Sequence, residues 1–67
     1  MARRPNHEDM DRLYQAIEDH MGERIRFFAR YFEWHPEKVA RHLLSMETVG
    51  MLVSEDERGG LWPFRRI

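Results

Sequence analysis

Apolar residues recur at helical spacing in the first third of the chain. Asn6 suits the position before a helix, and the acidic residues Glu8 and Asp9 suit a first turn. One stripe with steps of three and four then contains Met10, Leu13, Tyr14, Ile17 and Met21. Gly22 follows the stripe and can take the left-handed conformation that ends many helices. The pattern predicts a helix over about residues 7–21.

The same period predicts a second helix over about residues 23–33. One face of this segment is formed by Ile25, Phe28, Ala29 and Phe32. Phe27 and Tyr31 lie well away from that face. A short helix that is apolar on two sides is unusual on the surface of a monomer.

A third helix is predicted over about residues 36–49. Proline is tolerated at the first position of a helix, and it disfavours helical geometry at the residue before it, so the helix should begin at Pro36 after a turn that ends at His35. Its inward stripe consists of Val39, Leu43 and Met46. The opposite face gathers Glu37, Lys38, Arg41, Ser45 and Thr48. Gly50 is placed to end the helix.

After Gly50 the period changes from helical to extended. Residues 51–53 predict a short strand, residues 54–60 a polar turn with two glycines, and residues 61–67 a second strand. Pro63 cannot donate to a ladder, so we expect the second strand to be an edge or irregular there. The whole chain, residues 1–67, is therefore predicted to be one α+β domain, mainly α: a three-helix bundle with a two-stranded C-terminal β-hairpin over about residues 51–66.

Composition and charge reduce the range of possible functions. The 67 residues include no cysteine, which excludes disulfides and thiolate metal sites. No apolar run approaches the roughly 18 residues that span a bilayer, and no secretory leader is recognisable, so we expect a cytoplasmic protein that does not bind membranes. The net charge is −1, but residues 1–22 are acidic and residues 23–50 are slightly basic. Any surface for nucleic acid must therefore come from residues beyond the first helix.

Neither catalysis nor metal binding has support in the sequence. There is no nucleotide fingerprint, phosphate-cradling glycine loop or serine–histidine–acid arrangement. The four histidines, His7, His20, His35 and His42, lack the spacing of a zinc motif, although His35 and His42 are close enough to share a helical face. We expect no enzyme, no cofactor and no metal.

The order of helix, helix, helix and hairpin resembles the winged helix-turn-helix family, in particular repressors of the MarR and ArsR types. The resemblance covers about residues 8–64. It rests on Phe28-Ala29, on the stretch from Phe32 to Leu43, and on Met46-Glu47 and Gly50-Met51-Leu52. Two positions depart from the family pattern. Glu33 stands where the turn often has glycine, and His35 where serine or threonine is common.

The resemblance implies a double-stranded DNA-binding protein, a transcription regulator whose third helix enters the major groove. By position, Lys38, Arg41 and Ser45 would read the DNA, with Glu37 at the margin. Arg58 would reach DNA from the hairpin loop, and Arg26 and Arg30 would contact phosphates. The opposing interpretation is that these residues form an ordinary charged, solvated surface.

The chain also has more large apolar side chains than three short helices need. Trp62 and Phe64 are expected to close the hairpin against the helices, whereas Phe27, Tyr31 and Leu44 are candidates for an exposed interface. A symmetric homodimer would suit a palindromic DNA site. The alternative function is a winged-helix adaptor that binds another protein and no nucleic acid, which the acidic first helix and the surplus aromatic residues favour.

Overall fold

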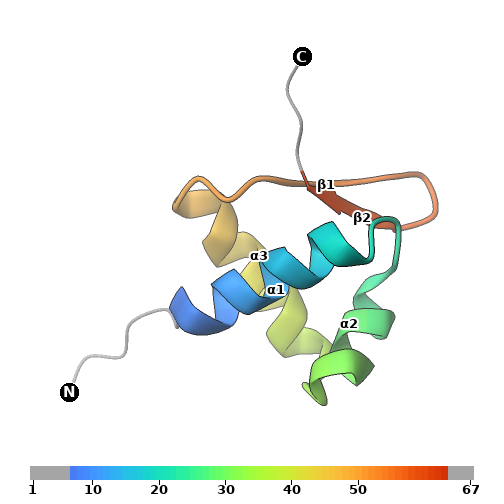
Figure 1. The fold of residues 1–67 in the computed structure, drawn as a ribbon, viewed down its shortest axis with the longest axis horizontal. Helices are drawn as coiled ribbons and strands as arrows, with labels where there is room; N and C mark the ends of the chain where they lie inside the picture. Colours follow the sequence, from blue (N-terminus) through green and yellow to red (C-terminus); the bar gives the residue numbers. More distant parts are fainter. Residues whose placement is uncertain (1–6, 64–67) are drawn as a thin grey trace.

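Three helices are followed by a β-hairpin, as the sequence predicts (Figure 1). The computed structural model describes residues 7–63. The helices are α1 (His7–Asp19), α2 (Ile25–Phe32) and α3 (Pro36–Thr48). The strands β1 (Val53–Glu55) and β2 (Leu61–Pro63) form one antiparallel sheet. The mainly helical α+β fold is thereby confirmed, while the part of the predicted hairpin beyond residue 63, including Phe64, lies outside the described residues.

The helices end earlier than the apolar stripes suggest. α1 ends at Asp19 rather than near residue 21, and residues 20–22 form a turn. Met21, expected in the buried stripe, is therefore 54% exposed. The apolar spacing extends to Met21, but the backbone leaves the helix before this residue and turns at Gly22, where φ is 91°. The spacing alone therefore predicted too long a helix.

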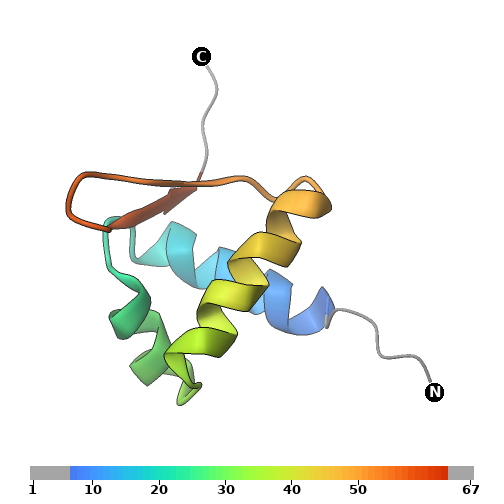
Figure 2. The ribbon, with the colours of Figure 1, turned by 180° about the vertical axis from the view of Figure 1, so that it is seen from behind.

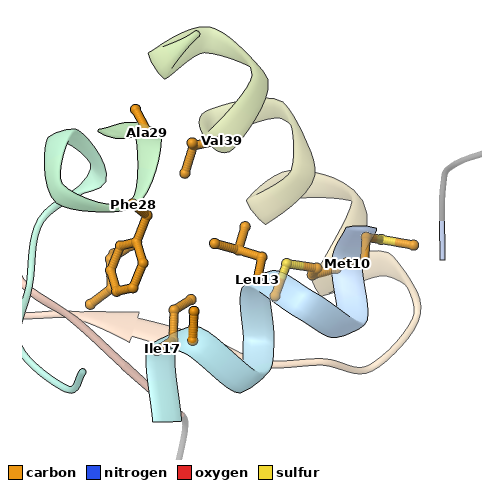
Figure 3. Close-up of a cluster of buried hydrophobic side chains, with 9 residues drawn as sticks. Met10, Leu13, Ile17, Phe28, Ala29 and Val39 are labelled. Atoms are coloured by element: carbon orange, nitrogen blue, oxygen red, sulfur yellow. The ribbon is translucent and has the colours of Figure 1, made fainter. Parts of the chain in front are cut away.

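Side chains from all three helices meet in one core. Figure 3 shows Leu13 and Ile17 of α1, Phe28 of α2 and Val39 of α3 pointing toward a shared interior. Each of these four side chains is fully buried. Ala29 is also buried, and its small size lets α2 approach α3 closely. Figure 2 shows α3 lying across α1, so its inward stripe closes the bundle.

The turn between α2 and α3 accommodates both departures from the winged-helix pattern. Glu33 adopts the left-handed conformation, with φ 61° and ψ 41°, at the position where glycine is common. The N–H of Trp34 donates to the carbonyl of Ala29 at 2.7 Å, and that of Glu33 donates to Arg30 at 3.2 Å, which is a Schellman motif. His35 replaces a hydroxyl cap, because its Nδ1 accepts from the N–H of Glu37 at 3.2 Å.

Replacing Glu33 with glycine should stabilise the fold. A non-glycine residue in the left-handed region lowers the free energy of unfolding by about 1–2 kcal/mol, and glycine removes this strain. Glycine also gives the unfolded chain more conformational freedom, which lowers the free energy of unfolding by about 0.4–1 kcal/mol. We expect the free energy of unfolding to rise by about 0.5–1 kcal/mol, measured by urea denaturation. The control Arg12→Gly, at an exposed interior position of α1, should instead lower it by about 1 kcal/mol. A destabilised Glu33→Gly variant would contradict this account of the turn.

The hairpin is attached to the helices through β2. The N–H of Gly22 donates to the carbonyl of Leu61, and the N–H of Leu61 donates to the carbonyl of Glu23, both at 2.8 Å. β2 therefore also contacts the α1–α2 connection, but it is an edge of the two-stranded sheet, as the sequence predicts. Pro63 is tolerated because it is the last residue of the strand, paired with Val53, and the bonds to the connection are made at Leu61.

Asp56 organises the loop of the hairpin. Its Oδ1 accepts from the backbone N–H of Arg58 at 2.9 Å and of Gly60 at 2.7 Å. Its Oδ2 accepts from the indole Nε1 of Trp62 at 2.9 Å. These bonds, the one from Trp62 above all, hold the pKa of Asp56 below its ordinary value of 3.8.

The lowered pKa of Asp56 makes the hairpin acid-sensitive. Because the folded-state pKa is lower than the unfolded one, the stabilisation is complete above pH 3.8 and is lost as the pH falls through the folded-state value. We expect the fluorescence of Trp62 to change in this acidic window, recorded in Trp34→Phe protein to remove the second indole. An Asp56→Asn variant should lack the transition. An equal transition in that variant would show that another group is responsible.

Candidate nucleic-acid interface

One face of α3 is open to solvent along its length. Seven of its residues are exposed: Pro36, Glu37, Ala40, Arg41, Leu44, Glu47 and Thr48. Helical spacing places Leu44, with 67% of its surface exposed, at the middle of this face. Arg41 is the one cation among these seven, so the face is less basic than the sequence suggested.

Lys38 lies at the edge of that face, turned toward α1. Its Nζ is 3.3 Å from Oδ2 of Asp9 and 4.3 Å from the centre of the Trp34 ring. The side chain remains 39% exposed. Lys38 thus already has an anionic and an aromatic partner within the chain, and DNA would have to compete with both.

Ser45 and His42 also lie toward the edge of α3 that faces α1 and the core. Ser45 lies one turn after Arg41 and is partly buried, so it is at the margin of the open face. The Nδ1 of His42 is 2.9 Å from the carbonyl oxygen of Lys38, which can only accept, so this nitrogen carries the hydrogen. Its Nε2 is buried without a partner among the described residues. His42 contacts the ring of Trp34 and is a packing residue.

Arg26 and Arg30 are next to the start of α3. Together with Trp34 and Pro36 they line a hollow of about 360 Å³ between α2 and the first turn of α3. Both arginines are exposed, and both lie on α2 one turn apart. The structure therefore brings these two predicted phosphate-binding residues to the helix–turn–helix surface.

The arginines of this surface are free of internal ion pairs. Among residues 7–63, no carboxylate lies within 4.0 Å of the guanidinium groups of Arg26, Arg30 and Arg41. The same holds for Arg24, just before α2, which the sequence analysis overlooked. Arg24 precedes the first residue of α2 and Arg30 lies in its last turn, so helical spacing did not group the two in the sequence.

Arg58 is not part of this surface. It lies exposed in the hairpin loop, and Figures 1 and 2 show that loop beside the α1–α2 connection rather than beside α3. Its neighbours Glu55, Asp56 and Glu57 are also exposed, which leaves the loop with net negative charge.

The residues predicted to form a dimer or partner interface lie on two separate surfaces, Phe27 and Tyr31 on α2 and Leu44 on α3. Phe27, expected on an exposed patch, is instead partly buried, because His20 and Phe28 pack against its ring at 5.1 and 5.0 Å. Tyr31 is 54% exposed and stacks on Phe27 at 5.9 Å. Leu44 lies on the separate face of α3. Trp62 is 40% exposed, but its indole covers Gly22 and so closes the hairpin against the helices.

Within residues 7–63, no three His, Cys, Asp or Glu side chains are arranged to hold a metal ion. In the same part of the chain, no helix has the length and the apolar character that crossing a bilayer requires.

Comparisons with protein-family models, with curated proteins and with solved structures found no match to the chain.

Proposed function

We propose that this protein binds double-stranded DNA, with α3 in the major groove, and acts as a transcription regulator of the winged helix-turn-helix type. The observation that carries the proposal is that Arg26 and Arg30 of α2 and Arg41 of α3 have no ion-pair partner among residues 7–63. Cations without internal partners are available to phosphates, and each phosphate that they neutralise releases condensed counterions from DNA.

The topology supports the same proposal. The hydrogen bonds between β2 and the α1–α2 connection fix the hairpin beside the three helices. This arrangement leaves one long face of α3 uncovered. An α-helix with an open face of this length fits the major groove of B-DNA. In this arrangement Arg41 reaches base edges or phosphates, while Arg26 and Arg30 contact the flanking backbone.

The position of Leu44 limits which surface could form a homodimer while α3 binds DNA. It lies on the same face as Arg41, so it can contact DNA or a second protein but not both. A homodimer on palindromic DNA would therefore have to use other residues, and exposed Tyr31 is the remaining predicted candidate.

The proposal is tested by titrating labelled duplex DNA with the protein over a series of salt concentrations, using fluorescence anisotropy. We expect binding at low salt and a log–log slope of about −0.9 for each phosphate contacted, or roughly −3 for the three arginines. Random-sequence duplex suffices for this test, because the phosphate contribution is independent of sequence. Absence of binding at low salt, or binding that does not weaken with salt, would overturn the proposal.

The alternative function, a protein-binding adaptor, is favoured by the exposure of Leu44. Leu44 and Leu52, the latter 40% exposed, line a hollow of about 350 Å³ between α3 and β1, with Glu47 and Glu55 at its margin. Acidic residues there repel phosphate and would suit a protein segment with basic and apolar residues. A Leu44→Ala variant separates the two functions, because it removes the apolar side chain without adding a charge. An adaptor would bind its partner less tightly, whereas a DNA-binding protein would keep most of the affinity that its arginines provide.

A further inference from the structure

A second hollow lies on the other side of Arg26 and Arg30, at the start of α2. It has a volume of about 550 Å³, which is in the range of small-molecule sites. Its walls are three arginines, two aromatic residues and the Gly22–Glu23 connection. None of these three arginines forms an ion pair within residues 7–63, so no salt bridge of the fold depends on them. Their charges are available to a ligand.

The charges in this pocket favour a ligand with more than one negative charge. The pocket lining contains three cations, Arg24, Arg26 and Arg30, and one carboxylate, that of Glu23. α2 also begins here without a side-chain cap, because Arg24 precedes the helix and has only donors. Free N–H groups and the positive end of the helix dipole add to the attraction for an anion. A phosphate or diphosphate group satisfies these donors better than a single carboxylate does.

The rings in the pocket favour a ligand that is also flat. Tyr31 is 54% exposed and its ring lies at 23° to that of Phe27, with centroids 5.9 Å apart. His20, in the turn after α1, contacts both rings, with centroids 5.1 and 5.2 Å away, and holds the pair in place. A rigid aromatic surface beside arginines is the combination on which nucleic-acid bases stack.

We propose that this pocket binds a nucleotide, with the phosphates against Arg24, Arg26 and Arg30 and the base against Tyr31. The same chemistry is supplied by a free nucleotide and by the nucleotides of a single strand. The inference goes beyond the DNA-binding proposal and does not depend on it. If both hold, a bound nucleotide occupies Arg26 and Arg30 and competes with duplex DNA.

The test is isothermal titration calorimetry of the full chain at low salt with ADP, adenosine, pyrophosphate and a short single-stranded oligonucleotide. We expect ADP to bind at least about tenfold more tightly than either adenosine or pyrophosphate, because only ADP uses both the arginines and the rings. Tighter binding of the oligonucleotide than of ADP would assign the site to single strands, and the reverse would assign it to free nucleotides.

Three variants complete the test. Tyr31→Ala and Arg24→Gln should each weaken ADP binding by about tenfold, while Arg12→Gln, on the exposed side of α1, should leave it unchanged. Both replaced pocket residues are exposed, and circular dichroism checks that the helices remain. The inference fails if neither ADP nor the oligonucleotide binds at millimolar concentration, if adenosine or pyrophosphate binds as well as ADP does, or if the two pocket variants behave like Arg12→Gln. No duplex is used, so such a failure leaves the DNA-binding proposal standing.

Discussion

Replacing Arg26, Arg30 and Arg41 together with glutamine should weaken the binding of duplex DNA by roughly a hundredfold or more at 0.1 M salt. A contact that releases a condensed counterion contributes roughly tenfold to the affinity at this salt concentration. The three guanidinium groups have no ion pair within residues 7–63 that DNA binding would break. The log–log slope with salt should fall in magnitude by about 3. Fluorescence anisotropy across a salt series measures both quantities.

The matched control for this variant changes the net charge by the same amount elsewhere. Arg12→Glu combined with Gln15→Glu also lowers the charge by three, but on the exposed side of α1. Its long-range repulsion should weaken binding only modestly and leave the slope nearly unchanged, because it removes no phosphate contact. If the control variant loses as much affinity and slope as the triple variant, the helix–turn–helix surface is not where DNA binds.

Replacing Gly60 with alanine should destabilise the fold by about 3 kcal/mol, which corresponds to about 15 °C in melting temperature for a domain of this size. An added Cβ at this position would lie against the backbone carbonyl of Gly22 and 2.7 Å from Oδ2 of Asp56. Neither can yield freely, because Gly22 is bonded to Leu61 and Asp56 holds the loop. We expect β2 to be pushed off the α1–α2 connection, exposing Leu61, which is 2% exposed in the native fold.

Gly50→Ala is the control for Gly60→Ala. Gly50 has a positive φ of 89° but nothing within 4 Å of an added Cβ, so its replacement costs only backbone strain, about 1 kcal/mol. Thermal unfolding followed by circular dichroism compares the two. An equal or smaller loss for Gly60→Ala would contradict the close contact between the hairpin and the α1–α2 connection.

The order of elements was readable from the sequence because each element depends on local chemistry. Steps of four, from Leu13 to Ile17 and from Val39 to Leu43, specify which side of a helix is buried. Pro36 marks the first turn of α3, and the structure begins the helix at that residue. What local patterns could not provide was the exact end of α1, where an apolar residue, Met21, continued the stripe without continuing the helix.

The surface was less readable because it depends on contacts that are distant in the sequence. Lys38 looked equivalent to Arg41 on a helical projection, but its partner Asp9 comes from α1. The bonds of Leu61 to the Gly22–Glu23 connection, which attach β2 to the helices, likewise join distant segments. Arg26 and Arg30 were identified from their position on α2. Their place between two hollows, one shared with Pro36 and one with Tyr31, became visible only in three dimensions.

The most direct test of the central proposal is amide NMR mapping of the protein during titration with duplex DNA at low salt. The account predicts the largest shift changes in the first half of α3, from Glu37 to Leu44, and at Arg26 and Arg30 of α2, with little change along the exposed side of α1 around Arg12. Changes confined to α1 or to the hairpin loop, or no changes at all, would contradict it.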